Sequence, residues 1–311
     1  AAVVMLTGQA SEHLGEQAVR AGAQDYLVKG EVAGHMLNRV IRYAVERRRA
    51  EEAQRALHVA QIRAQENARL ERGLLPSPLL TDTRLSVSAR CLPGGQHHLL
   101  GGDFYDVVET SDGWVHALIG DVCGRGPAEA ALGVCLRVAW RTLVLAGRPA
   151  EEILATLSEL LDHERQDDTM FATMCMLSVH PDRTSGWLRM AGHLPPLLLS
   201  RIGVTELPTR PAAPLGLSEV RDWPGIPIRL DGTWSILLYT DGLIEGRIGK
   251  GSERLGSDGL MDLIRDALGG PGQPGEELLD QVIDRVRELN GGDLDDDLAV
   301  LALGFSFPAG P

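Results

Sequence analysis

The sequence has few cysteines, a deficit of positive charge and no long apolar run, and each of these shortages excludes a class of protein. Its four cysteines include no C-x-x-C pair, and His97 and His98 have no partners at zinc spacing, so neither a zinc knuckle nor a disulfide framework is indicated. A formal net charge of −13 argues against a nucleic-acid-binding surface. No apolar run reaches the roughly 18 residues that span a bilayer, and the first residues lack the order of a signal peptide. We therefore expect a cytoplasmic protein that binds neither nucleic acid nor membrane.

The chain of 311 residues, 44% of them hydrophobic, suffices for one large domain or two ordinary ones. It opens with an apolar strand, AAVVMLTGQ, followed by a helix-like stretch and a second short strand, AQDYLVKG. Alternation of strands and helices predicts a parallel sheet. We interpret residues 1–46 as part of an α/β domain.

Residues 1–46 resemble the C-terminal part of a response-regulator receiver domain, the module of two-component signalling. The resemblance rests on Thr7 and Lys29, which end the two strands that bracket the family's phosphorylation pocket, and on Tyr26, in the place of the switch aromatic. The family's phosphoacceptor aspartate belongs to earlier strands that this sequence does not contain. We therefore expect a partial domain that accepts no phosphate itself. A chance strand–helix–strand fragment is the alternative.

Residues 37–75 contain no proline and one glycine, and their many Ala, Glu, Arg and Gln residues predict a long helix. Apolar positions between Ala50 and Leu74 recur on a 3,4 spacing, which is typical of a coiled-coil seam. We assign residues 47–75 to a helical linker. Two interpretations stay open: the linker forms a homodimer, or it packs as a single helix on its own domain.

The prolines of LLPSPLL end this helix, so a new domain begins near Pro76. Strand-like runs then come in pairs with hairpin spacing, which predicts antiparallel sheets. Amphipathic helices begin at Pro127 and Pro149, a favoured first helical position. Paired strands and paired helices together indicate an α+β sandwich over residues 76–311.

Carboxylates stand at the ends of apolar strands in four places. Asp103 follows two glycines, Asp121 ends ALIGDV, Asp241 ends LLYTDG, and residues 295–297 precede LAVLAL. A single aspartate there is an ordinary turn former. If the four ends converge, the carboxylates repel one another unless cations lie between them. Oxygen-only donors suit Mg²⁺ or Mn²⁺, and two such ions are a common device for hydrolysing a phosphate ester.

Seven blocks, GGDFYD, GDVCGRGPAEA, FATM, AGHLPPLLL, PLGL, LLYTDGLIE and DDDLAVLAL, resemble those of the metal-dependent PPM (protein phosphatase 2C-like) Ser/Thr phosphatases, in the expected order. More narrowly, the blocks look like the bacterial branch typified by the stage II sporulation protein E phosphatase and the stress-response sigma-factor regulators. The resemblance covers about residues 76–305. It implies two antiparallel β-sheets sandwiched between helices, with two Mn²⁺ or Mg²⁺ ions at one edge.

The resemblance implies a ligand set of aspartates and one backbone carbonyl. Carried over position by position, the metal ligands are Asp103, Asp121, the carbonyl of Val122, Asp241 and Asp296. Asp297 is a one-residue-off alternative for the last ligand, and Asp295 is a weaker one. We assign catalysis to Asp121 and Asp103, which would hold the reacting centre.

Three side chains near these ligands are candidates for a supporting role. Asp106 either touches a metal through water or caps its strand, and Arg125 either attracts a substrate phosphate or is solvated. Asp297 is the third candidate. Ala299 stands where the family has Thr or Ser, which removes a hydroxyl close to the last metal aspartate. The segment from Ile244 to Leu255 stands where the family has a variable flap.

The sequence supports two hypotheses from different classes. The first is an enzyme that removes phosphate from serine or threonine of a regulatory protein, by family analogy a phosphorylated anti-sigma-factor antagonist, under the control of an upstream receiver domain. The second is a catalytically weak phosphatase-fold module that binds a signalling partner, which would require a weakened metal site. A receiver-driven transcription factor is disfavoured, because no basic recognition helix follows the receiver-like segment.

Overall fold

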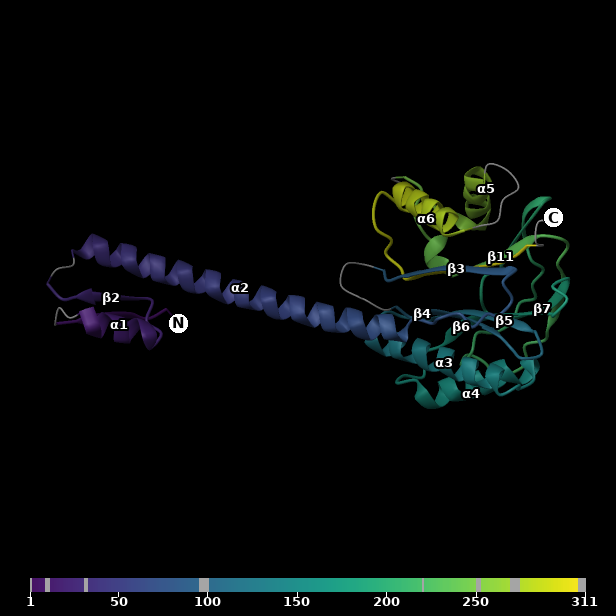
Figure 1. Cartoon of the computed structure of the whole chain (residues 1–311), viewed down its shortest axis with the longest axis horizontal. Coiled ribbons are helices and arrows are strands. Elements are labelled where there is room, and N and C mark those ends of the chain that lie inside the picture. The colour runs from purple at the N-terminus through teal and green to yellow at the C-terminus, as the bar shows by residue number, and fades with distance from the viewer. Residues whose placement is uncertain are drawn as a thin grey trace. The chain divides into compact units, whose positions relative to one another are not determined.

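The computed structural model consists of two compact units, which divide between Gly73 and Leu74 (Figure 1). The first contains the receiver-like segment and most of a long helix, and the second contains two five-stranded sheets. No helix in the described part of the chain is long and apolar enough to cross a membrane. The structure describes residues 2–8, 12–30, 33–94, 101–219, 221–249, 253–268 and 275–306. His97 and His98 lie outside these ranges.

The first unit begins with a strand, a helix and a second strand parallel to the first, as the sequence predicts. These are β1 (Val4–Thr7), α1 (Glu12–Arg20) and β2 (Asp25–Val28). The amide of Lys29 donates to the carbonyl of Thr7 at 2.7 Å, so the ends of the two strands lie side by side. This is the arrangement expected of a piece of a parallel sheet.

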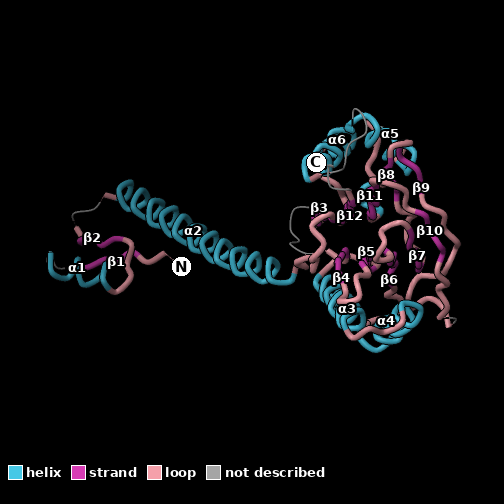
Figure 2. The backbone as a smooth tube through the Cα atoms, turned by 45° about the vertical axis from the view of Figure 1, so that its right-hand side comes forward, coloured by secondary structure: helices cyan, strands magenta, loops and turns pink. Residues whose placement is uncertain are grey.

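One unbroken helix, α2 (Gly34–Leu74), runs through the predicted boundary at residues 46–47 (Figure 2). Exposed Arg–Glu pairs one turn apart lie along it, such as Arg48 and Glu52 at 2.7 Å. The side chains of residues 63–73 are outside the described set. Dimerisation through this helix therefore stays a prediction.

The second unit is built on two five-stranded antiparallel sheets, which confirms the expected fold class. One sheet has the order β10-β7-β6-β5-β4, and the other has the order β3-β12-β11-β8-β9. Strands β4 to β7 pair in sequence order, with α3 and α4 inserted between β5 and β6, whereas β12 inserts between β3 and β11. The strands are β3 (Leu85–Leu92), β4 (Asp103–Glu109), β5 (Val115–Val122), β6 (Ala172–Val179), β7 (Ser185–Ala191), β8 (Leu197–Ser200), β9 (Gly203–Glu206), β10 (Ile226–Arg229), β11 (Trp234–Tyr239) and β12 (Leu298–Phe305).

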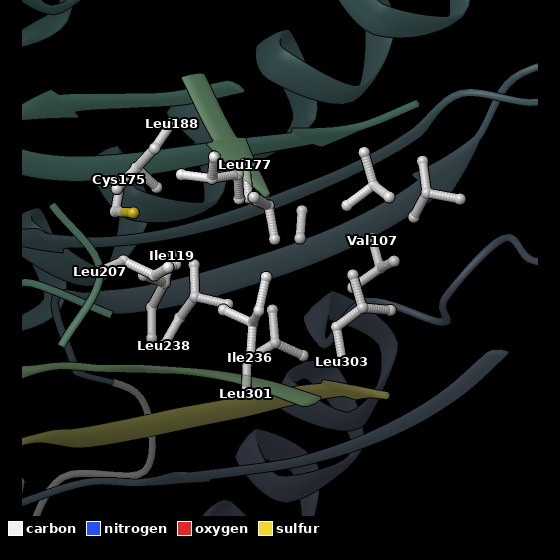
Figure 3. Close-up of a cluster of buried hydrophobic side chains, with 14 of the residues drawn as sticks. Val107, Ile119, Cys175, Leu177, Leu188, Leu207, Ile236, Leu238, Leu301 and Leu303 are labelled. Atoms are coloured by element: carbon white, nitrogen blue, oxygen red, sulfur yellow. The ribbon is translucent and has the colours of Figure 1, made fainter. Parts of the chain in front are cut away.

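The apolar core forms one layer between the sheets and one on each outer face. Figure 3 shows the inner layer, where Val107, Ile119, Leu177 and Leu301 lie between the two sheets. Side chains one position along the strand, such as Leu118, face the helices instead, because strand side chains alternate. Helices α3 (Pro127–Leu145) and α4 (Ala150–Glu164) cover one sheet, and α5 (Gly256–Leu268) and α6 (Glu276–Asn290) cover the other.

Leu301→Ala tests the inner layer, because Leu301 is fully buried there. We expect the free energy of unfolding to fall by about 2–5 kcal/mol, since two packed sheets cannot close over the cavity. Urea unfolding followed by tryptophan fluorescence measures the change. The matched control is Leu217→Ala, at a position that is 54% exposed, where we expect a change below about 0.5 kcal/mol. Equal losses in the two variants would contradict the core assignment.

Candidate metal centre

Asp103 and Asp121 lie side by side at one edge of the first sheet. They are directly opposite in the antiparallel register of β4 and β5. Burial and the charge of Asp121 raise the pKa of Asp103 well above its ordinary value. Burial, and then the charges of Asp241 and Asp296, raise the pKa of Asp121 to about 7.

The other two predicted aspartates come from the second sheet. Asp241 begins a short 3-10 helix, η1 (Asp241–Leu243), directly after β11, and Asp296 stands just before β12. Since β11 and β12 are antiparallel neighbours, the end of one lies beside the start of the other. Burial, then the charges of Asp296 and Glu245, raise the pKa of Asp241. The structure therefore brings all four aspartates into one electrostatic cluster.

The donor set of this cluster fits a hard divalent cation. All its side-chain donors are carboxylate oxygens, which Mg²⁺ and Mn²⁺ prefer. Burial, and then the charges of neighbouring aspartates, raise the pKa values of Asp103, Asp121 and Asp241, and a cation between the carboxylates would offset both effects. The side chains do not stand as a closed cage, because no three acidic, histidine or cysteine groups among the described residues are arranged to hold a metal ion. Binding would therefore involve some movement of the carboxylates.

Thr240 is a part of the site that sequence reasoning missed. It is fully buried, and its Oγ1 donates to Oδ2 of Asp103 at 2.6 Å. Oγ1 of Thr240 also accepts a hydrogen bond from the amide of Ala299 at 2.8 Å. The contact with Asp103 joins the two sheets. Ala299 brings no hydroxyl to the cluster, and the hydroxyl of Thr240 supports Asp103 and not Asp296. The sequence feature that could have indicated this role is the position of Thr240 directly before the candidate ligand Asp241.

Asp296 and Asp297 have different surroundings, which separates the two alternatives for the last ligand. Asp297 is buried, and its two oxygens accept the amides of Gly94 at 2.8 Å and Gly102 at 3.0 Å. Asp296 is half-buried and faces Arg125, whose Nε lies 3.0 Å from Oδ1. Asp297 therefore holds the backbone beside the site, and the assignment of Asp296 as the last metal ligand stays a prediction.

Asp106 does not reach the cluster, so the prediction that it supports the metal ligands is wrong. It is fully buried against α3, where Nε of Arg141 donates to it at 2.7 Å and Nη1 of Arg137 at 3.2 Å. The reason is the alternation of a strand, in which residues three positions apart point to opposite faces. Asp103 therefore faces the second sheet, whereas Asp106 faces the helices.

The carbonyl of Val122 lies close to the backbone beside Asp103. A Cβ added at Gly102 would come within 2.5 Å of that oxygen, so only glycine fits there. The amide of Val122 in turn donates to the carbonyl of Gly102 at 3.2 Å. The role of the Val122 carbonyl as a metal ligand stays a prediction.

The three receiver-like positions belong to the other compact unit. Thr7 ends β1 and Lys29 follows β2, and Tyr26 lies in β2 opposite Met5. The arrangement is that of the predicted segment. The assignment to a receiver domain stays a prediction.

Two antiparallel sheets between helical layers, with aspartates meeting at one edge, define the class of PP2C-type phosphatase domains. Residues 111–306 match the family model of Stage II sporulation protein E (SpoIIE). The match spans more than half of the chain, and the chain belongs to this family. Asp121, Asp241 and Asp296 fall within the matched residues, and Asp103 precedes them.

Solved structures share the fold. The RsbU and RsbW domains of Rv1364c from Mycobacterium tuberculosis are 27% identical with a TM-score of 0.63, and the match covers 73% of this chain and 61% of that one. The PP2C domain and a regulatory fragment of SpoIIE from Bacillus subtilis are 18% identical with a TM-score of 0.61, and the match covers 73% of this chain and 64% of that one. The SiaA PP2C domain of Pseudomonas aeruginosa is 20% identical with a TM-score of 0.62, and the match covers 80% of this chain and 98% of that one. This chain thus spans less than two thirds of the first two chains.

The raised pKa of Asp121 predicts how the stability of the metal-free protein depends on pH. An unfolded aspartate has a pKa of about 3.9, and the folded value is about 7, so folding favours the protonated form. This stabilising contribution is fully present below about pH 4 and is lost as the pH rises through about 7. We expect the Tm in EDTA to fall over that window, and Asp121→Asn to make the fall smaller. The control is Asp295→Asn, at an exposed position, which should leave the pH profile of the Tm as in wild type. An Asp121→Asn profile identical to that of wild type would refute the prediction.

Proposed function

We propose that this chain is a metal-dependent phosphatase that hydrolyses phosphoserine or phosphothreonine on a regulatory protein. The observation that carries the proposal is the convergence of Asp103 and Asp121 from one sheet with Asp241 and Asp296 from the other. Buried carboxylates that raise one another's pKa are costly to fold without a cation between them. Membership of the SpoIIE family supports the same reaction class.

The roles of the residues follow from their positions. Asp103, Asp121, Asp241 and Asp296 would hold two Mg²⁺ or Mn²⁺ ions, and Thr240 fixes the orientation of Asp103. When bound, such ions lower the pKa of a water and neutralise charge on the phosphate during in-line displacement. A solved relative, RsbX, is described in complex with magnesium, at 14% identity and a TM-score of 0.52.

The substrate phosphate would enter beside Asp296. This residue lines a cavity of about 720 Å³ together with Arg125, Arg247 and Arg254. A guanidinium group can donate two parallel hydrogen bonds to two oxygens of one phosphate, so these arginines suit a phosphorylated side chain. Arg247 and Arg254 belong to the flap-like segment from Ile244 to Leu255, of which residues 250–252 lie outside the described residues. In this proposal Arg125 leaves Asp296 when the cations bind and contacts the phosphate.

For the substrate, we propose a phosphorylated anti-sigma-factor antagonist. The likeness to stress-response sigma-factor regulators supports this choice. The M. tuberculosis relative, which carries RsbU and RsbW domains in one chain, supports it further. Dephosphorylation would then change the binding partner of the antagonist.

We also propose that an upstream receiver domain controls the phosphatase through α2. A sheet of two strands is rarely stable alone, and the apolar side chains of Val3 and Leu6 beside it are 52% and 45% exposed. These exposures support a larger α/β domain around β1 and β2. A shift in α2, or its dimerisation, would then pass the signal on.

A catalytically weak binding module is the second candidate. Two observations favour it: Arg125 already pairs with Asp296, and no closed ligand cage stands among the described residues. In such a protein the ion pair would persist, and a partner would bind at the cavity without being hydrolysed.

Hydrolysis of p-nitrophenyl phosphate in Mn²⁺ tests the proposed reaction. We expect metal-dependent turnover. Asp121→Asn should lower kcat/KM at least about 100-fold, since it removes a proposed metal ligand that lies among the other three aspartates. Asp295→Asn is the matched control and should stay within about twofold of wild type. A wild-type protein that binds Mn²⁺ weakly and shows no turnover would favour the binding module.

Titration calorimetry with Mn²⁺ separates the two adjacent acids. Asp296→Asn is expected to weaken Mn²⁺ binding about tenfold or more without lowering the Tm of the metal-free protein. Asp297→Asn is expected to lower that Tm, because two buried amides lose a charged acceptor, a loss of about 1.5–3 kcal/mol. The reverse pattern would exchange the two roles.

A further inference from the structure

A second cavity lies at the other end of the sheet that carries Asp103 and Asp121. Its volume is about 820 Å³, and it is lined by the β4–β5 turn, the α3–α4 connection and the helix-facing side of β7. Glu109 at this end of β4 is six residues from Asp103, roughly 20 Å along a strand. The cavity is therefore separate from the candidate metal centre, and its size is that of a small-molecule site.

The cavity contains a buried arginine whose hydrogen bonds are incomplete. The side chain of Arg189 on β7 is 10% exposed, its Nε is buried without a hydrogen-bond partner, and its closest acid is Glu151 at 3.5 Å. Glu151 itself is 71% exposed, so this pairing is loose. By contrast, the buried Arg183 contacts Glu109 at 2.9 Å and the carbonyl of Gly113 at 2.7 Å. A buried guanidinium with free donors is costly unless an acceptor reaches it.

The side chains that the strands place beside Arg189 are aromatic or neutral. Trp187, which is 43% exposed, Ser178 and His116 form one row across β7, β6 and β5. Nδ1 of His116 lies 3.0 Å from the hydroxyl of Ser178, and burial lowers the pKa of His116 to about 4, so the ring is neutral near pH 7. Trp114 stacks beside His116 with 6.3 Å between ring centroids. These groups offer flat apolar surface and weak polar contacts. A second arginine, Arg148, also lines the cavity, but it is 55% exposed and pairs with Glu152.

The backbone around Arg189 leaves room for a ligand. Helix α4 begins at Ala150, which lines the cavity, and its N-cap, Pro149, supplies no side-chain hydrogen bond to the first turn. The positive end of that helix therefore adds to the field of Arg189. A Cβ added at Gly225 would stand 3.1 Å from both the guanidinium and the Trp187 ring, so glycine keeps these side chains uncrowded.

We propose that this cavity binds a small organic monoanion: a carboxylate attached to a flat aromatic body. The carboxylate accepts from the Arg189 guanidinium and displaces Glu151, while the ring lies against Trp187 and Trp114. A polyphosphate does not suit the cavity, because Glu109, Asp112 and Glu151 line it and would repel further negative charge. The site does not depend on the proposed phosphatase activity.

Binding of 2-naphthoate, measured by titration calorimetry and ligand-observed NMR, tests the proposal. We expect 2-naphthoate to bind at least about tenfold more tightly than its neutral isostere 2-naphthamide, since a charge-assisted pair with Arg189 is lost in the amide. AMP, which carries a dianionic phosphate, should bind more weakly than 2-naphthoate. Asp121→Asn should bind 2-naphthoate as wild type does, which keeps this site distinct from the metal centre.

Variants at the cavity locate the binding. Arg189→Met should abolish the preference for 2-naphthoate, whereas Arg201→Met, at an exposed turn, should preserve it. Trp187→Ala is the second variant, because its partly exposed side chain can be removed with little effect on folding, and it should weaken 2-naphthoate at least about threefold. Equal affinity for acid and amide, no detectable binding at millimolar ligand, or unchanged binding in Trp187→Ala would each overturn the proposal.

Discussion

The face-to-face packing of two sheets is the constraint on which the candidate metal centre depends. Asp103 and Asp121 belong to one sheet, and Asp241 and Asp296 flank strands of the other, so they can meet only if the sheets stack with those edges aligned. The apolar layer holds the sheets together without direction. Direction comes at the edge, where the hydroxyl of Thr240 links the two sheets through Asp103 and the amide of Ala299.

Close backbone packing lets so many acids share one edge. Both oxygens of Asp297 bind backbone amides, and a Cβ at Gly242 would stand 1.9 Å from the carbonyl oxygen of Asp297. The charge of Asp297 is thus stabilised by hydrogen bonds to the backbone, whereas its neighbour Asp296 lines a cavity. The two adjacent aspartates therefore lie in different surroundings, one bound to backbone amides and the other beside Arg125 at the cavity.

The sequence predicted the features that depend on local pattern and failed where contact between distant strands decides. Paired strands and helices indicated the α+β fold, and carboxylates at strand ends indicated Asp121 and Asp241, because a charge after an apolar run stands out in one dimension. Asp106 was misplaced, although its spacing of three from Asp103 contained the information about opposite faces. Thr240 was missed because its role is visible only when β12 lies beside β11. The sequence did not indicate that Arg189 is buried, since a basic residue in a strand is ordinarily taken to point to solvent.

The two arginines that pair with the buried Asp106 also bind backbone carbonyls at the start of the second compact unit. Arg137 also donates to the carbonyl of Leu74, the last residue of α2, at 3.0 Å, and Arg141 donates to the carbonyl of Ser77 at 2.9 Å. Arg137 therefore joins the last residue of α2, and Arg141 the segment just after it, to β4, the strand that begins with Asp103. Removing one member of a buried charge network leaves the others unpaired, so these bonds resist being broken singly. A displacement of these backbone segments would have to carry α3 and β4 with it or break several charged hydrogen bonds at once.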